Sequence, residues 1–199
     1  DLGHPALAPY LKLRDDRAHR DQGVFIAEGA KITTRLLESP IRVASLLLPE
    51  NWLDRLMPLI EERNEEIHAF VAPKKELEQL TGFGMYQGVN SVGCIPLPMA
   101  LGDVASAKDG PVLFVAIDDL TGADNVGTVA RNGLAFGADA MIVGDTSCSA
   151  WLRKSVRTSM GTVFRLPIVE STSLPDTLKK LRQRGIQTVF TRHTKQFND

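Results

Sequence analysis

The chain has 199 residues, of which 43% are hydrophobic and 24% are charged, and its net charge is −1. These values are typical of a soluble globular protein with one large domain or two small ones. They exclude a membrane-spanning helix, because no apolar run approaches the roughly 20 residues that such a helix needs. The N-terminus shows no signal peptide, so we expect a cytoplasmic protein. Cys94 and Cys148 form no Cys-x-x-Cys pattern, so we expect reduced thiols and no metal site.

The charge is unevenly distributed along the chain. Residues 151–199 contain 10 Lys and Arg against 3 Asp and Glu, whereas residues 1–150 contain 13 against 21. A basic end segment on a near-neutral chain predicts either an RNA-binding face or a solvated helix surface. Both interpretations remain open at this point.

The first 22 residues are polar and predict a short helix. Arg14, Arg17 and Arg20 lie here among several aspartates. This stretch is either a solvated helix or a basic N-terminal arm that contacts RNA.

Residues 24–95 alternate between strand-like and helix-like patterns. Apolar and β-branched runs predict strands at 24–27, 43–48, 67–71 and 89–95. Helical spacing of apolar residues predicts helices from 28–29 onward, over 52–60 and over 75–80. This order predicts an α/β domain.

Proline, glycine and small residues dominate residues 96–110, which indicates a linker. We therefore expect a first domain over 1–98, a linker over 99–110 and a second domain over 111–199.

The second domain opens on an apolar run, Pro111 to Ile117, which predicts a strand buried on both faces. A polar turn follows it. From Asn125 onward the apolar residues fall on one helix face, and Gly137 ends that helix before a second strand at 140–143. This order is typical of a parallel α/β sheet.

The remaining elements continue the alternation. We expect a helix over 151–159, a strand over 162–169, a helix that carries Leu174 and Leu181, and a strand over 187–191.

Polar residues follow the first strand of the second domain. Ligands of parallel α/β sheets bind beyond the carboxyl ends of the strands. Asn125 lies near the start of the helix there, and Arg131 follows six residues later. An amide and a guanidinium at this place suit phosphate and ribose oxygens. The alternative is that Asn125 only caps the helix and Arg131 only pairs with a surface acid.

Two blocks of the second domain resemble the SpoU family of ribose 2'-O-methyltransferases, in the SPOUT class. The first is Asn125, Gly127, Arg131 and the Ala-Phe-Gly at 135–137. The second is Arg157-Thr158-Ser159-Met160-Gly161 with Phe164 and the Pro-Ile at 167–168. The first domain is similar to the L30e-like substrate-binding domain of many SpoU proteins, through Phe25-Ile26-Ala27-Glu28-Gly29 and Gln87-Gly88. For Glu28 and Gly29 we favour a structural role, with Glu28 as a helix-start charge and Gly29 as a backbone requirement.

The resemblance implies a fold, a reaction and a set of site residues. The fold is an L30e-like α/β domain followed by a SPOUT-type parallel-sheet domain. The reaction is methyl transfer from S-adenosylmethionine to a ribose 2'-hydroxyl of rRNA or tRNA. Arg131 would hold the adjacent phosphate, Asn125 would orient Arg131 or the ribose, and Thr191 would contact the cofactor. The expected RNA contacts are Arg14, Arg17, Arg20, Arg153, Lys154 and Arg157. We expect Ser159 and Gly161 to shape a loop, and we expect a homodimer without a bound metal.

The family's Gly-Asn-Glu-Gly-like loop and Ser-Leu-Asn-Val-Ser block do not occur in this sequence. In the family these segments bind most of the cofactor and form a trefoil knot. We therefore expect a SPOUT domain that is incomplete before the knot, and weak or no methyl transfer by this chain alone.

Two other functions compete with methyl transfer. One is a non-catalytic RNA-binding protein that retains the fold. The other is a nucleotide-dependent oxidoreductase, which the missing Gly-x-Gly-x-x-Gly pattern argues against.

Overall fold

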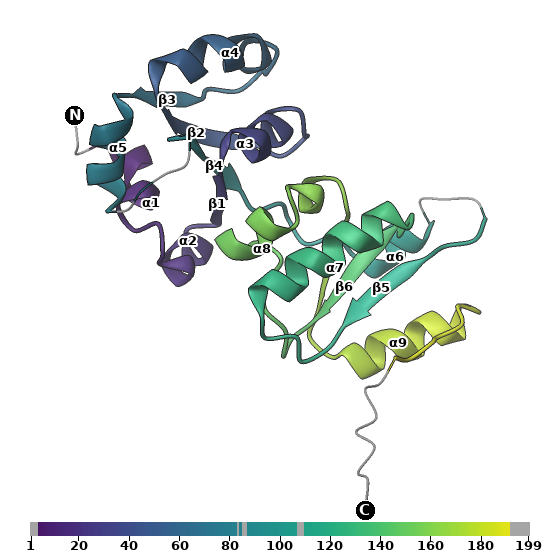
Figure 1. Cartoon of the computed structure of the whole chain (residues 1–199). Coiled ribbons are helices and arrows are strands. Elements are labelled where there is room, and N and C mark those ends of the chain that lie inside the picture. The colour runs from purple at the N-terminus through teal and green to yellow at the C-terminus, as the bar shows by residue number, and fades with distance from the viewer. Residues whose placement is uncertain (1–3, 83, 85–86, 107–109, 192–199) are drawn as a thin grey trace, which may run out of the picture.

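The computed structural model describes residues 4–82, 84, 87–106 and 110–191. Two α/β units follow each other along the chain, and helix α8 (Arg153–Thr158) of the second unit lies against the first (Figure 1). The first three residues of the predicted N-terminal arm, part of the predicted linker and everything beyond Thr191 lie outside the described residues.

The first unit is built on a four-stranded sheet. Its elements are η1 (Pro5–Leu7), α1 (Ala8–Leu11), α2 (Asp16–Asp21), β1 (Val24–Glu28), α3 (Ala30–Leu37), β2 (Val43–Leu48), α4 (Glu50–Glu61), β3 (His68–Val71), α5 (Lys74–Thr81) and β4 (Asn90–Cys94). The strand order is β1-β4-β2-β3, with β4 antiparallel to both neighbours and β3 parallel to β2. The four strands predicted for this unit are confirmed.

The second unit is built on a three-stranded sheet. Its elements are α6 (Leu101–Ser106), β5 (Phe114–Ile117), α7 (Ala123–Ala135), β6 (Ala140–Gly144), α8, η2 (Thr162–Phe164), β7 (Ile168–Ser171) and α9 (Leu174–Gln183). The order β5-β6-β7 is parallel throughout, so the predicted α/β class with a parallel sheet is confirmed.

Alternating residues of β6 face the two sides of this sheet, as the period of a strand requires. Ala140 and Ile142 pack with α6 and α9, whereas Met141 and Val143 belong to the larger core that α7 and α8 complete. The second unit therefore has a helix layer on each face of its sheet.

Several predicted elements differ from the structure. Part of the predicted linker forms α6, whose Val104 is buried in the core of the second unit. The strand expected over 162–169 is a 3-10 turn followed by β7, which begins only at Ile168. Apolar composition alone could not separate these pieces, because both are buried.

Two further strand predictions were wrong. β5 is not buried on both faces, because its Ala116 is exposed. Residues 187–191 form no strand, and Val189 and Phe190 are 81% and 69% exposed. A β-prone run becomes a strand only when a neighbouring strand pairs with it.

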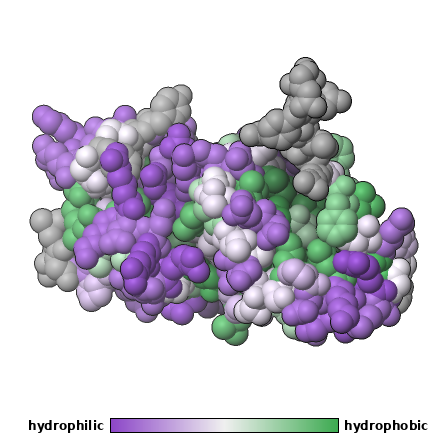
Figure 2. Space-filling model, turned by 90° about the horizontal axis from the view of Figure 1, so that it is seen from below, coloured by the Kyte–Doolittle hydropathy of each residue, from purple (hydrophilic) through white to green (hydrophobic). Residues whose placement is uncertain are grey.

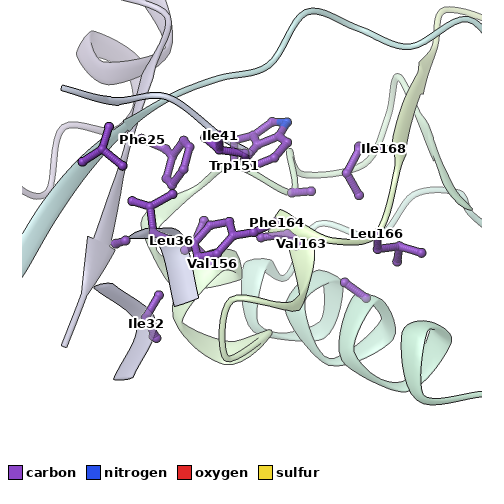
Figure 3. Close-up of a cluster of buried hydrophobic side chains, with 14 of the residues drawn as sticks. Phe25, Ile32, Leu36, Ile41, Trp151, Val156, Val163, Phe164, Leu166 and Ile168 are labelled. Carbon is purple, nitrogen blue, oxygen red and sulfur yellow. The ribbon is translucent and has the colours of Figure 1, made fainter. Parts of the chain in front are cut away.

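One hydrophobic core spans both units. Phe25 of β1 stacks on Phe164 of η2, with ring centroids 5.6 Å apart, and its centroid lies 5.2 Å from that of Trp151. Figure 3 shows these rings close together, with Leu36 of the first unit at the left and Ile168 of the second unit at the right. The units therefore share buried apolar surface, which fixes α8 relative to β1.

Tyr10 of α1 anchors the N-terminal segment on the first sheet. Its side chain is completely buried, and its hydroxyl lies 3.0 Å from the Ser45 Oγ. Burial raises the pKa of Tyr10 above its ordinary value of 10.0.

This buried phenol predicts an alkaline loss of stability. Above pH 10 the unfolded chain loses the Tyr10 proton and the folded chain keeps it, so the free energy of unfolding should fall as the pH rises. In Tyr10→Phe the decline should be shallower, as measured by urea unfolding between about pH 8 and about pH 11. Equal slopes for the two proteins would contradict this assignment.

Candidate functional site

Helix α7 begins directly after the loop that follows β5. Gly122 is its N-cap residue and makes no side-chain capping hydrogen bond, and Asn125 is the third residue of the helix. The side-chain nitrogen Nδ2 of Asn125 lies 3.1 Å from the place where a Cβ of residue 122 would be. The side chain of Asn125 therefore folds back beside Gly122 without capping α7, which excludes the capping interpretation.

Asn125 and Arg131 are both exposed on α7. Six residues along a helix separate them by about 9 Å in height and about 120° around the axis. Within the described part of the chain, neither side chain makes a hydrogen bond or an ion pair. No acidic residue in this part of the chain therefore pairs with Arg131, contrary to the surface-acid interpretation. Both side chains are available to an external ligand.

Gly127 lies between these two residues on α7, at the point where α7 meets α8. A Cβ at this position would lie 2.4 Å from the Ser155 carbonyl oxygen and 2.8 Å from the Ser159 amide nitrogen. Backbone atoms of α8 thus touch the backbone of α7. Gly127 is a packing residue that brings α7 and α8 together.

Asp124 and Lys154 also join these two helices. The Lys154 ammonium lies 2.6 Å from an Asp124 carboxylate oxygen, and the Thr158 hydroxyl donates to the other oxygen at 3.1 Å. The hydrogen bond from Lys154 is the largest cause that lowers the pKa of Asp124. Lys154, predicted as an RNA contact, is therefore paired within the chain.

Arg153 and Arg157 are paired as well, and with the other unit. Both guanidinium groups contact the carboxylate of Glu28, at the end of β1, and the Arg157 contact measures 3.2 Å. The side chains of Glu28 and Arg153 are only 21% and 20% exposed. Glu28 is therefore an ion-pair partner between the two units, where we had predicted a helix-start charge.

Gly29 takes the backbone role predicted for it, since its φ is +100° and a Cβ there would meet no neighbouring atom. Ser159 and Gly161 likewise shape a turn. Ser159 is fully buried, its hydroxyl donates to the Val156 carbonyl, and the Gly161 amide donates to the Ser159 hydroxyl. Arg35 of α3 donates to the carbonyl of Met160 in the same turn. The second sequence block is thus a junction between the two units.

The three arginines of the N-terminal segment lie at different places. Arg14 lines a shallow depression between the first helices and the end of α5. Arg20, at the end of α2, lines a cavity of about 260 Å³ at the carboxyl ends of β6 and β7, together with Asp145, Glu170 and Ser171. Arg17 is exposed. Only Arg20 is therefore brought to the strand ends where ligands are expected.

Side chains of the β6–α8 loop organise the neighbouring strand ends. Thr146 accepts from the Asp119 amide at 3.1 Å and donates to Asp118 at 3.0 Å, and Ser147 accepts from the Leu120 amide at 3.1 Å. Asp119 adopts a positive φ of 50°. These contacts link the loops after β5 and β6, which sequence reasoning missed because Thr146 and Ser147 belong to no motif.

Thr191 is exposed and belongs to no strand. Over the described ranges, no group of three or more His, Cys, Asp and Glu side chains could hold a metal ion. No described helix is both long and apolar enough to cross a membrane.

Comparisons with known proteins agree with this architecture. Residues 112–199 match the model of the SpoU rRNA Methylase family. An uncharacterised tRNA/rRNA methyltransferase of Mycobacterium ulcerans (strain Agy99) is 27% identical over 169 residues, which are 83% of this chain and 48% of that protein. A similarly named protein of Mycolicibacterium smegmatis is 28% identical over 170 residues, which are again 83% of this chain and 48% of that protein. The chain therefore spans about half the length of the curated relatives it matches.

Solved structures share the fold of both units. The SpoU methyltransferase AviRb from Streptomyces viridochromogenes, in complex with AdoMet, superposes with a TM-score of 0.72 at 21% identity, over 92% of this chain and 68% of that one. The AdoMet-bound rRNA methyltransferase from Sinorhizobium meliloti gives a TM-score of 0.72 at 21% identity, over 92% and 67%. Residues 112–199, which contain the parallel sheet of the second unit, thus match the SpoU rRNA Methylase family in sequence.

Proposed function

We propose that this chain belongs to an enzyme that transfers a methyl group from S-adenosylmethionine to a ribose 2'-hydroxyl of rRNA or tRNA. The observation that carries the proposal is the exposed pair Asn125 and Arg131, on the helix that follows β5 within the segment matching the SpoU family. Relatives named as tRNA/rRNA methyltransferases and AdoMet-bound neighbours support it.

Arg131 has a positioning role in this proposal. A guanidinium donates two parallel hydrogen bonds to a phosphate and thereby orients the ribose beside it. A guanidinium has hydrogen-bond donors and no acceptor, so it is a poor general base. Asn125 can donate to or accept from the ribose. Alignment of the two reactants can lower the barrier by several kcal/mol, up to about 7–11 in favourable cases.

S-adenosylmethionine would supply the electrophilic methyl group. Thr191 remains a predicted cofactor contact, but it is exposed and follows the exposed Val189 and Phe190. Val189, Phe190 and Thr191 are thus open to solvent. We therefore assign no step of the reaction to the residues around Thr191. In this proposal, Asn125 and Arg131 contact the RNA substrate.

A homodimer in the cytoplasm is part of the proposal. Figure 2 shows the face of the molecule that lies below in Figure 1. Hydrophobic residues gather on the second unit in this view, whereas the first unit is mainly hydrophilic. Exposed apolar side chains of the second unit include Leu113, Phe136, Val189 and Phe190. Apolar surface of this kind supports association with a second copy.

The test is a map of methylated riboses in total RNA from cells with and without the gene product. Replacing Arg131 with Ala should reduce the mark by roughly 100-fold, because a lost phosphate contact misplaces the ribose. Arg55→Ala removes another exposed arginine, on α4 of the first unit, and should leave the mark unchanged. Full methylation by Arg131→Ala, or a mark on a base instead of a ribose, would refute the proposal.

The alternative is a non-catalytic RNA-binding protein with the same fold. The ion pairs of Arg153, Lys154 and Arg157 reduce the number of basic groups left for RNA on α8. RNA binding by the full-length protein without any affinity for S-adenosylmethionine would favour that alternative.

A further inference from the structure

A cavity of about 470 Å³ lies between the two units, outside the site just described. Its walls are mainly apolar and come from both units, with Ile41 and Ile95 on one side and Trp151, Phe164 and Ile168 on the other. The volume falls within the range of about 300–1,000 Å³ that small-ligand sites occupy. Its aromatic and aliphatic lining suits a flat apolar group.

Two arginines line the same cavity, one from each unit. Arg42 precedes β2, and Arg165 follows η2. Both are exposed, and neither side chain forms an ion pair or a hydrogen bond with another described residue. This distinguishes them from Arg35, Arg153 and Arg157, which have partners within the chain. Two unpaired guanidinium groups beside an apolar cavity complement a ligand that carries negative charge next to a flat apolar body.

Glu170 connects this cavity to the smaller one at the strand ends. It lines both cavities, and the smaller one also contains Arg20. The Glu170 carboxylate is exposed and has no ion-pair partner among the described residues. It can accept a hydrogen bond from an amino group on a base edge. The two cavities, which share Glu170, together offer an apolar space, three cations and an acceptor.

We propose that the cavity between the units receives the base of an unpaired RNA nucleotide, while Arg42 and Arg165 bind the phosphates on either side of it. This inference rests on RNA being the substrate, as in the proposed function, and names a second contact region for that RNA. Single-stranded RNA is recognised by placing splayed-out bases against aromatic or apolar groups and phosphates against cations. A purely apolar peptide would leave both guanidinium groups without a partner.

Tryptophan fluorescence provides a direct readout. The chain has two tryptophans, Trp52 on α4 and Trp151 in the cavity wall. In the variant Trp52→Phe, Trp151 is the one remaining tryptophan of this chain, so the tryptophan emission reports on the cavity wall. Short single-stranded RNA should quench it in a saturable way, and a fully base-paired duplex of the same sequence should not. Absence of quenching with every single strand would overturn the inference.

The charge contribution is tested in the same Trp52→Phe background. Arg42→Ala and Arg165→Ala should each weaken binding about five- to tenfold and reduce the slope of log K against log salt by about 0.7. The control is Lys75→Ala, which removes an exposed charge from α5 in the first unit. Its affinity and salt slope should match the parent. If Lys75→Ala weakens binding as much as the arginine variants do, the binding is general electrostatic attraction and the inference fails.

Two further outcomes separate this inference from its alternatives. Quenching that grows with protein concentration in the absence of RNA would mean that a second copy of the chain fills the cavity. The titration requires neither S-adenosylmethionine nor methyl transfer. Specific quenching without any ribose methylation in cells would therefore reject the proposed reaction and support the binding site. Ribose methylation without quenching would support the reaction and reject the binding site.

Discussion

Replacing Gly127 with Ala is expected to lower the free energy of unfolding by about 2–3 kcal/mol, as overpacking of a close contact does. The new Cβ would lie 2.4 Å from the Ser155 oxygen, 2.8 Å from the Ser159 nitrogen and 3.0 Å from the Thr158 Cβ. Two of these three atoms are backbone, so no side-chain rotation can relieve the clash and α7 must move away from α8. Urea unfolding followed by circular dichroism measures the effect.

Gly133 in the same helix provides the matched control. A Cβ there would lie 3.4 Å from the Val115 Cγ2 and 3.7 Å from the Ala138 Cβ, which are near-ordinary contacts. Gly133→Ala should be neutral or stabilising by up to about 1 kcal/mol, because alanine favours a helix interior over glycine. Equal destabilisation by both variants would show that helix backbone geometry, and not contact with α8, explains Gly127.

Glu28→Gln is expected to destabilise the chain by about 2 kcal/mol, since it removes a negative charge that lies against a largely buried guanidinium. The substitution preserves shape but removes the charge that Arg153 and Arg157 share. Because these arginines belong to the other unit, the contact between the units should loosen. Limited proteolysis should then cut faster within residues 96–110, and urea unfolding should shift to lower concentration.

Asp124→Asn is the matched control for Glu28→Gln. Asp124 also binds a cation of α8, but the side chains of this pair are 50% and 63% exposed, so little loss of stability is expected. The pKa of Asp124 is lowered in the folded chain, so its contribution is present above the ordinary value of 3.8 and disappears as the pH falls. The difference between Asp124→Asn and the parent should therefore vanish in acid. A loss as large as that of Glu28→Gln at neutral pH would contradict the burial argument.

Local patterns in the sequence predicted most of the elements. The run from Val43 to Leu48 was predicted as a strand with the bounds that β2 has. In α7, Val126, Ala130 and Gly133 share a buried face, as their helical spacing required. These features depend on neighbouring residues alone. The same reasoning failed at 187–191, because strand formation there depends on a partner strand that local sequence does not specify.

The sequence by itself determined the α/β order, the parallel sheet and the motif that places Asn125 and Arg131 on one helix. Only the tertiary structure decided which charges are free. From composition, Arg153 and Arg157 are predicted as RNA contacts. In the structure, both pair with Glu28, which lies more than 120 positions earlier in the chain. Arg42 and Arg165 belong to no motif, and they become neighbours of one cavity only because the two units pack together. Periodicity reports which face of an element is buried, whereas the partner of a charge depends on how distant elements meet.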